Sequence, residues 1–239
     1  MRRIVGLARR AIDKYEMIQP NDVIAVGVSG GKDSLALLCA LCELKRFYPV
    51  PFTIKAIVLD PCFFNEEGDY SGIEKLCRGY GIECIIKRCE LYSLIFEVRK
   101  EKSPCSMCSK MRRGILHDVA KENGCNKIAL GHTRDDAVET FLMNLLSCGN
   151  ISCFAPKTYL SRKDITAIRP LIYATERDTQ SVAERKNLPI VKSRCPVDEK
   201  TNREDTKNLV LQLSLKYTSL PEKIIGAMER AGINGWKAE

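Results

Sequence analysis

Ser29-Gly30-Gly31-Lys32-Asp33-Ser34 is the stretch that decides the fold of this chain. It follows a short apolar run at residues 23–28 and precedes an apolar helical pattern over residues 34–47. In a Gly-rich turn between a buried strand and a helix, backbone N–H groups and the positive end of the helix can converge on a phosphate. Glycine also permits positive φ and close approach of a ligand. We therefore predict a phosphate-binding loop that opens a βαβ unit.

The side chains of this loop suit a nucleotide and its metal ion. We expect the hydroxyls of Ser29 and Ser34 to donate to phosphate oxygens, Lys32 to add a positive charge, and Asp33 to hold the Mg²⁺ that accompanies ATP. A Walker A loop is excluded, because Val26 stands where its first Gly belongs and Lys32 is followed by an acid. The run resembles instead the PP-loop of ATP pyrophosphatases, which cleave ATP between the α and β phosphates. A plain strand-to-helix turn, the alternative, does not require the complete run.

Strands and helices alternate along the rest of the chain. Further strands are predicted at residues 54–59, 82–87, 127–130 and, as an edge strand, 165–168, and further helices at 2–17, 71–80, 106–123, 137–147 and 176–186. A loop is expected over 148–164, and residues 203–231 are typical of two helices broken near residue 220. Such alternation predicts an α/β, Rossmann-like fold with a mainly parallel sheet and helices on both faces.

The same pattern suggests three segments. Residues 1–20 form a basic amphipathic helix, residues 21–195 a nucleotide-binding catalytic domain, and residues 196–239 a small helical extension. The longest apolar run, residues 35–42, is much shorter than the roughly 20 residues that cross a bilayer. The basic N-terminus lacks the apolar stretch of a secretory signal, and Asp13 and Glu16 argue against a mitochondrial presequence. We expect a cytoplasmic protein without a membrane span.

The charge and the cysteine content bear on partners and metals. A net charge of +8 favours a polyanionic partner, although a moderately basic enzyme fits equally well. The chain has 12 cysteines, most of them inside apolar patterns where they act as small hydrophobic residues. Cys105 and Cys108 instead begin a helix rich in basic residues, where we expect lowered thiol pKa values and metal binding. A redox dithiol, half of a zinc site and a chance pair remain alternatives.

A third thiol ligand would decide between these alternatives. No second Cys-x-x-Cys pair is present to close a zinc tetrahedron. Cys195 is the best candidate because it lies between basic residues and a proline, and Cys148 and Cys153 are its competitors. An iron–sulfur cubane held by three cysteines keeps one iron without a protein ligand, where sulfide can bind.

Taken together, the motifs resemble the tRNA 2-thiocytidine synthetase family, which is related to the tRNA 2-thiouridine synthetases. The resemblance rests on the PP-loop, residues 105–114 (CSMCSKMRRG), residues 131–136 (GHTRDD), residues 169–171 (RPL) and Cys195. It implies ATP-dependent thiolation of a tRNA pyrimidine at C2, with anticodon-loop cytidine as the expected target. It also implies a 4Fe-4S cluster on three cysteines, a homodimer, and sulfide or a cysteine desulfurase as sulfur donor.

The resemblance assigns roles residue by residue. Catalytic groups are expected at Asp33, Arg112 and Asp136, and cluster ligands at Cys105, Cys108 and Cys195. The residues expected to bind ATP are Ser29, Gly30, Gly31, Lys32, Asp33, Ser34, Asp60, Gly131, His132 and Asp135. The chain departs from the 2-thiouridine branch in lacking zinc-binding cysteine pairs at its ends and in having Arg112 where that branch has lysine. The run after Cys195 also differs from the thiocytidine enzymes.

Some assignments have simpler alternatives. Asp135 and Asp136 can cap the helix that follows them, since Asp is favoured at helix starts. Basic side chains are candidates for tRNA phosphate contacts: Arg2, Arg3, Arg9, Arg10, Arg162, Lys163, Lys200 and Arg203. Two other functions remain open, a PP-loop enzyme that modifies a different substrate and a metal-binding structural protein that has lost catalysis.

Overall fold

A computed structural model describes residues 1–98, 104–196 and 202–238 of the chain. Within these ranges the centre is a six-stranded sheet with strand order β3-β2-β1-β4-β6-β5. The strands are β1 (Asp22–Val28), β2 (Phe52–Asp60), β3 (Glu83–Arg88), β4 (Lys127–Ala129), β5 (Lys157–Leu160) and β6 (Ile165–Ile168). Neighbouring strands pair in parallel except β5, which is antiparallel to β6. The predicted α/β fold with a mainly parallel sheet is confirmed.

Two predictions about the edge of this sheet were wrong. The expected loop over 148–164 contains β5, and β6 lies between β4 and β5 rather than at the edge. The side chains of β5 alternate between exposed and half-buried, so the sequence contains no apolar run that would predict this strand. Its hairpin with β6 turns through Asp164, which has a φ of 46°. The strand is recognisable only from its pairing partner.

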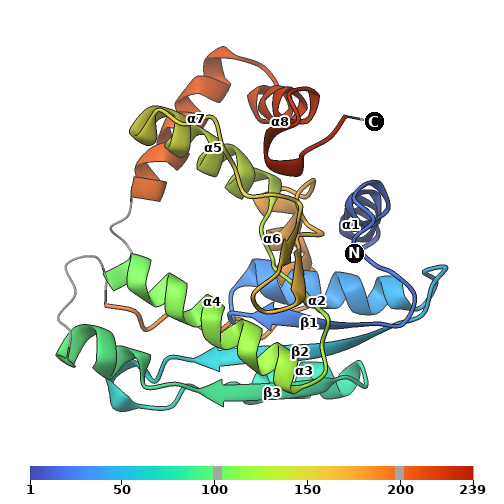
Figure 1. The fold of residues 1–239 in the computed structure, drawn as a ribbon, viewed down its shortest axis with the longest axis vertical. Helices are drawn as coiled ribbons and strands as arrows, with labels where there is room; N and C mark the ends of the chain where they lie inside the picture. Colours follow the sequence, from blue (N-terminus) through green and yellow to red (C-terminus); the bar gives the residue numbers. More distant parts are fainter. Residues whose placement is uncertain (99–103, 197–201, 239) are drawn as a thin grey trace.

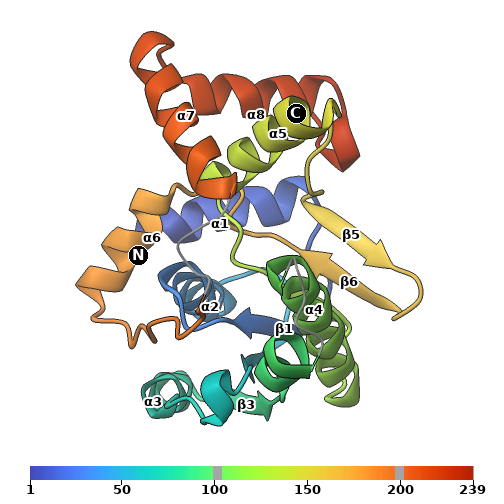
Figure 2. The ribbon, with the colours of Figure 1, turned by 90° about the vertical axis from the view of Figure 1, so that its left-hand side faces the viewer.

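Helices cover both faces of the sheet (Figure 1 and Figure 2). They are α1 (Arg2–Lys14), α2 (Lys32–Lys45), α3 (Ser71–Gly79), α4 (Pro104–Glu122), α5 (Arg134–Cys148), α6 (Glu176–Arg185), α7 (Asn202–Lys216) and α8 (Leu220–Arg230). Buried side chains of α1, α2, α3 and α6 share the larger core on one face. On the other face α4 packs Leu116, Val119 and Ala120 against Ala25, Ile57 and Ile128.

The register of the central strands places the site. Val28 at the end of β1 pairs with Val58 of β2, and Val26 pairs with Ala129 at the end of β4. Because these strands are parallel, their carboxyl ends lie at one edge of the sheet, where α/β folds bind ligands. The loop at residues 29–34 and the segment after β4 therefore meet at this edge.

The last two helices pack mainly on α5, at a distance from the sheet (Figure 2). The chain then returns to the core through Trp236, which is fully buried. Its indole Nε1 donates to the carbonyl of Phe154 at 2.9 Å, and its ring meets that of Tyr15 edge-on. Among the described residues, no helix is both long enough and apolar enough to cross a bilayer.

Candidate functional site

The phosphate loop is held by hydrogen bonds among its own residues. The Ser34 hydroxyl donates to the carbonyl of Gly31 at 2.9 Å and accepts from the backbone N–H and the hydroxyl of Ser29 at 3.1 and 3.2 Å. Gly30 has a φ of 86°, a conformation that favours glycine. The Ser34 proton is thus donated inside the loop rather than toward a ligand, while Ser29 lines the cavities described below.

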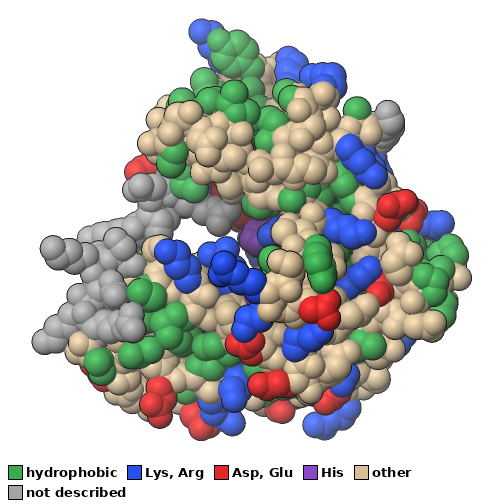
Figure 3. Space-filling view, viewed as in Figure 1, with side chains coloured by type: hydrophobic (Ala, Val, Ile, Leu, Met, Phe, Trp, Pro, Cys, Tyr) green, Lys and Arg blue, Asp and Glu red, His purple; other side chains and the backbone are tan. Residues whose placement is uncertain are grey.

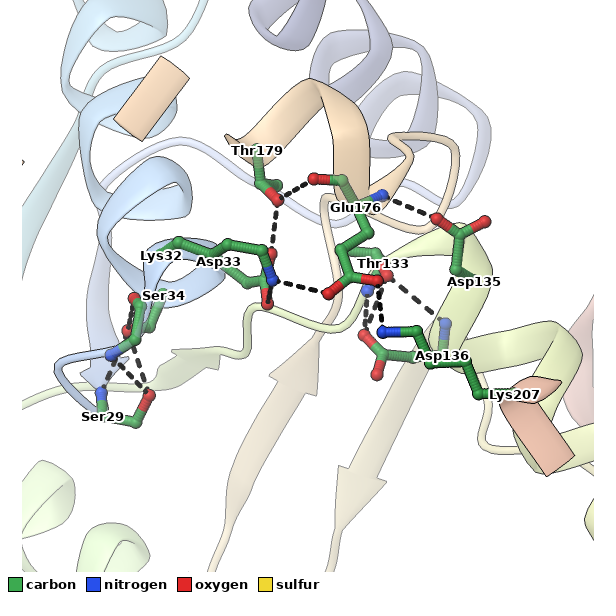
Figure 4. A network of polar contacts seen from close by, with 11 residues as sticks. Ser29, Lys32, Asp33, Ser34, Thr133, Asp135, Asp136, Glu176, Thr179 and Lys207 are labelled. Carbon is green, nitrogen blue, oxygen red and sulfur yellow. Dashed lines mark hydrogen bonds and ion pairs between the residues drawn. The ribbon is translucent and has the colours of Figure 1, made fainter. Parts of the chain in front are cut away.

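Lys32 and Asp33 are held by the first turn of α6 (Figure 4). The Lys32 ammonium lies 2.8 Å from Glu176 and 3.2 Å from Asp33, and the Thr179 hydroxyl donates to Asp33. Glu176 also pairs with Lys207 of α7 at 2.9 Å. Burial lowers the pKa of Lys32, but Glu176 and Asp33 outweigh it and the net shift is upward. Burial raises the pKa of Asp33, against the effects of Thr179 and Lys32.

The segment after β4 approaches the phosphate loop closely. A Cβ at Gly131 would stand 3.1 Å from backbone atoms of Asp33 and Ser34, so a larger residue here would require the PP-loop backbone to shift. Thr133 and Asp136 form a capping box at the start of α5, with Thr133 N donating to Asp136 at 2.7 Å. Asp135 accepts from the backbone N–H of Glu176 at 2.6 Å. Asp136 therefore caps α5, as the simpler alternative predicts, whereas Asp135 binds the first N–H of α6 and not the helix that follows it.

A cavity of about 590 Å³ opens beside the loop at the carboxyl ends of β1 and β2. Asp60, 2% exposed, lines it and accepts from the N–H groups of Cys62 and Gly68 at 3.0 and 2.8 Å and from the Tyr70 hydroxyl at 3.4 Å. Its carboxylate therefore organises the segment 61–70, which forms one wall. Polar lining residues include Ser29, Glu66, Asp69, Arg112, Lys192, Ser193 and Arg194. We call this space the loop cavity.

A second cavity, of about 540 Å³, contains all three predicted cluster ligands. Cys105 and Cys108 reach it from the first turn of α4, and Cys195 from the segment after α6. His132, expected to bind ATP, lines this cavity and packs on the ring of Phe154 at 4.9 Å between centroids. We call this space the cysteine cavity.

The two cavities adjoin one another. Four side chains line both of them: Ser29, Phe63, Arg112 and Ser193. Basic side chains gather over α4 at the edge of a hollow in this face of the molecule (Figure 3). Arg112 also lines a third, smaller cavity of about 140 Å³, which lies between α4 and the sheet. The three thiols thus meet beside the phosphate loop.

The donor set of the cysteine cavity fits an iron–sulfur cluster better than a single ion. Within the described residues no three His, Cys, Asp or Glu side chains group closely enough to hold one metal ion. A zinc ion needs each sulfur about 2.3 Å from one point. In a cluster each thiolate binds its own iron, so three thiols spaced around one cavity are suitable. The two other candidates for the third ligand lie elsewhere. Cys153 is buried and its thiol donates to the carbonyl of Ala137, and Cys148 is the last residue of α5.

One expectation about these thiols was wrong. The pKa of Cys108 is raised rather than lowered, because burial outweighs the nearby charge of Arg112. The negative forms of Cys195 and Cys105 add to the upward shift. These couplings reflect the same proximity that brings the three thiols to one cavity.

Comparison with known proteins identifies the family of this chain. A family model described as a PP-loop domain matches residues 7–213. The chain belongs to the PP-loop family. Within it, the chain is 38% identical over 230 residues to the tRNA-cytidine(32) 2-sulfurtransferase of Syntrophotalea carbinolica, covering 95% of this chain and 88% of that protein. It is 38% identical over 234 residues to the protein of the same name from Dichelobacter nodosus, covering 96% and 85%. The family resemblance drawn from the motifs is confirmed.

A solved PP-loop structure also resembles this chain. The U34-tRNA thiolase NcsA from Methanococcus maripaludis, solved with its 4Fe-4S cluster, has a TM-score of 0.73 and 25% identity, covering 95% of this chain and 77% of that one. The fold of this chain therefore occurs in a cluster-containing tRNA thiolase.

The structure of this PP-loop protein separates the three residues expected to be catalytic. Arg112 lines the loop and cysteine cavities, whereas Asp33 and Asp136 line an acidic cavity of about 220 Å³ together with Asp135 and Glu176. Gly30, Gly31 and Gly131 shape the backbone, and of the loop only Ser29 and Gly31 line the loop cavity. Lys200 and the side chain of Arg203 lie outside the described residues.

Other contributions had no local sequence signal. Glu176 and Thr179 contact the PP-loop from a position about 145 residues later in the chain. Three of the four α1 arginines expected to contact phosphates have partners within the protein: Arg3 pairs with Asp178, Arg9 with Asp13, and Arg10 lies over the ring of Tyr173. The basic side chains that line the cavities are instead Arg112, Arg113, Lys192 and Arg194.

Proposed function

We propose that this chain is an ATP-dependent tRNA sulfurtransferase that thiolates a pyrimidine at C2, with cytidine as the target base. The observation that carries the proposal is the shared wall of the two cavities. Ser29 of the PP-loop and Arg112 of α4 line both the loop cavity and the space around the three thiols. A nucleotide bound on one side and sulfur delivered on the other would meet at this wall. The names of the relatives given above support the same reaction.

In the proposed reaction the C2 oxygen of the base attacks the α-phosphate of ATP, and pyrophosphate leaves. Sulfide then attacks C2, and AMP departs with the oxygen. When bound, a 4Fe-4S cluster held by Cys105, Cys108 and Cys195 would supply an iron without a protein ligand, where sulfide can bind. The protein's own residues bind and orient the reactants, since positioning and charge compensation account for much of the catalysis of such transfers.

Arg112 is the residue best placed to act on both halves of the reaction. Its side chain lines both cavities, and a guanidinium offers a planar set of N–H donors. It would offset the charge that develops on the departing AMP. Lys32 has its ammonium engaged by Glu176 and Asp33, so triphosphate binding must compete with these ion pairs. Asp33, with its raised pKa, is proposed to face the metal ion that accompanies ATP.

The substrate, assembly and location belong to the same proposal. A base must leave its stack to reach two adjoining cavities, which suits an unpaired position in the anticodon loop. The basic lining residues Arg113, Lys192 and Arg194 are proposed to meet the tRNA backbone. A homodimer, a cytoplasmic location, and sulfide or a cysteine desulfurase as donor stay predictions.

The test is reconstitution under anaerobic conditions. Purified protein containing iron and acid-labile sulfide is incubated with tRNA, ATP, Mg²⁺ and sulfide, and the nucleosides are analysed by mass spectrometry. We expect 2-thiocytidine together with AMP and pyrophosphate. Cys105→Ala should abolish thiolation and leave ATP binding intact. Thiolation by cluster-free protein would refute the role of the cysteines.

The same experiment decides a second candidate. Likeness to a U34-tRNA thiolase favours 2-thiouridine as an alternative product. The two nucleosides differ in mass, so one chromatogram distinguishes them. Formation of 2-thiouridine alone would keep the chemistry and change the target base.

A further inference from the structure

Four aromatic side chains gather beside the cysteine cavity. Tyr92 is at their centre, with its ring 5.3 Å from Phe96 in a stacked arrangement, 5.0 Å from Phe64 and 6.3 Å edge-on from Phe63. We name Phe63, Phe64, Tyr92 and Phe96 the aromatic cluster. None of its members belongs to the motifs that suggested the function, and the proposed chemistry does not use them.

The cluster faces the cysteine cavity more than the loop cavity. Phe96 lines the cysteine cavity, and Phe63 lines both spaces at their shared wall. Phe64 is 50% exposed, a large fraction for a phenylalanine next to other rings. Aromatic surface at the mouth of a site that also contains Arg112 is suited to a flat, partly polar ligand.

The backbone holds Phe63 in place with unusual conformations. The residues on either side, Cys62 and Phe64, have φ of 49° and 58°, in the left-handed region that non-glycine residues rarely adopt. The Asp60 carboxylate holds this turn by accepting from the N–H of Cys62 at 3.0 Å. The backbone N–H of Tyr92 also stabilises the turn by donating to the carbonyl of Pro61 at 3.3 Å. These contacts hold the backbone on either side of Phe63, and its ring meets that of Tyr92 edge-on.

We propose that the aromatic cluster is a stacking site for the target nucleobase, with the face of Phe63 as its platform at the wall between the two cavities. The inference deepens the proposed function and rests on it. Single-stranded bases are recognised by stacking on aromatic rings and guanidinium planes, and every base offers such a face. Phe63 supplies the ring and Arg112 a guanidinium on the same wall.

The position of the cluster favours the target base over the adenine of ATP. Adenine bound in the loop cavity would have Phe63 at one end. Of the two cavities, however, Phe96 lines only the cysteine cavity. A pyrimidine on Phe63 would lie next to both the PP-loop residue Ser29 and the cysteine cavity. That is the placement the reaction needs, because one carbon must meet both phosphate and sulfur.

The test compares Phe63→Leu with Phe63→Tyr. Leucine keeps apolar bulk and loses the ring face, whereas tyrosine keeps the face. The probe is an anticodon stem-loop RNA labelled for fluorescence anisotropy, without ATP. We expect Phe63→Leu to weaken its binding about ten-fold or more and Phe63→Tyr to stay within about two-fold. Because Phe63 also lines the loop cavity, the KM for ATP can change as well, but by a smaller factor than the affinity for the RNA. Phe47→Leu is the matched control, since Phe47 is 56% exposed and lines none of the cavities described above.

A second measurement guards against a folding defect in the leucine variant. Phe63→Trp keeps an aromatic face and adds a fluorophore, and the chain's single tryptophan, Trp236, is fully buried. The stem-loop should quench the new fluorescence, and a fully paired hairpin of the same length should not.

The outcomes separate this inference from the function. RNA binding by Phe63→Leu equal to wild type, absent quenching in Phe63→Trp, or a raised KM for ATP with unchanged RNA binding would each overturn the stacking site. Thiolation by the wild-type protein would still support the proposed function in those cases. Conversely, weakened RNA binding in Phe63→Leu with no thiolation by the wild type would support the stacking site and refute the function.

Discussion

Within the six residues of the PP-loop, the two serine hydroxyls are hydrogen-bonded to members of the loop itself, whereas the cysteine cavity draws its thiols from positions 105, 108 and 195. The loop is thus shaped by contacts among its own residues. Among the described residues, the three thiols do not form a group tight enough for a single metal ion.

The difference reflects how far apart the interacting residues are in sequence. Neighbouring residues close a turn at little entropic cost, so local hydrogen bonds suffice to shape the PP-loop. Bringing Cys195 to Cys105 requires the intervening strands and helices to fold first. Metal binding then couples to that folding, because a thiolate site is completed by what it binds. Substitutions should therefore affect the two regions differently.

The largest effect is expected from Cys195→Ser. Losing the distant thiol should reduce iron and acid-labile sulfide in anaerobically purified protein and bring tRNA thiolation to background. ATP binding, measured by calorimetry, should stay at the wild-type level because the PP-loop does not depend on this thiol. Cys148→Ser is the matched control, as Cys148 is exposed and lines none of the described cavities. Loss of ATP binding in Cys195→Ser would mean that the two regions are not independent.

The next largest effect is expected from Gly131→Ala. The added Cβ would meet backbone atoms of Asp33 and Ser34 at 3.1 Å, so the PP-loop must shift. We expect a loss of about 1–3 kcal/mol in the free energy of unfolding by urea, together with weaker ATP binding. Gly6→Ala in α1 is the control, because nothing lies within 4 Å of its added Cβ. Equal stability of the two variants would contradict the close approach.

A smaller effect is expected from Thr179→Val, which removes the hydroxyl that donates to Asp33 and keeps the side-chain shape. A hydrogen bond to a charged group contributes about 1.5–3 kcal/mol, and water can replace part of it here because Asp33 is about one third exposed. We expect a loss of about 1 kcal/mol in urea unfolding. Thr179→Ser keeps the hydroxyl and should retain the contact with Asp33, at the cost of one buried methyl group. A neutral Thr179→Val would show that α6 does not hold the loop.

The smallest effect is expected in the pH dependence of Glu176→Gln. The hydrogen bond with Lys32, followed by that with Lys207, lowers the pKa of Glu176 from its ordinary 4.5 in spite of burial. A lowered folded-state pKa means that the ion pair stabilises the protein above pH 4.5 and loses its effect as pH falls through the folded-state pKa.

The difference in unfolding free energy between wild type and Glu176→Gln should therefore be constant above pH 4.5 and shrink below it. Urea titrations across this range measure it. Glu184→Gln, later on the same helix, is the control. A difference that grows on acidification would reverse the assigned sign.

Much of the fold follows from local patterns. The sequence shows the apolar runs of β1 and β2 and the helical spacing of apolar residues in α2. These patterns are visible because the buried positions of each element are mostly apolar residues. β5 escaped prediction because its alternation of exposed and half-buried side chains resembles that of a loop. Cys195 lines the same cavity as Cys105 and Cys108, whereas Cys153 is buried elsewhere, and the role of Cys195 as the third ligand stays a prediction.

The site was less predictable than the fold. Asp33, Arg112 and Asp136 were all expected to be catalytic, and the structure places the two aspartates in a different cavity from Arg112. A motif lists residues without saying which side of a helix each one faces. The aromatic cluster gave no signal either, because its members come from two segments that meet only after β2 and β3 have paired.

The sequence by itself determined the phosphate loop, the alternation of strands and helices, and the Cys-x-x-Cys pair at the start of α4, because these depend on residue type and short spacing. Only the tertiary structure decided that the thiols and the loop share one wall, that α6 holds Lys32 and Asp33, and that Phe63 lies between the two cavities. Those relations join residues far apart in the chain. They exist because parallel strands bring their carboxyl ends to a single edge, a geometry that no local pattern encodes.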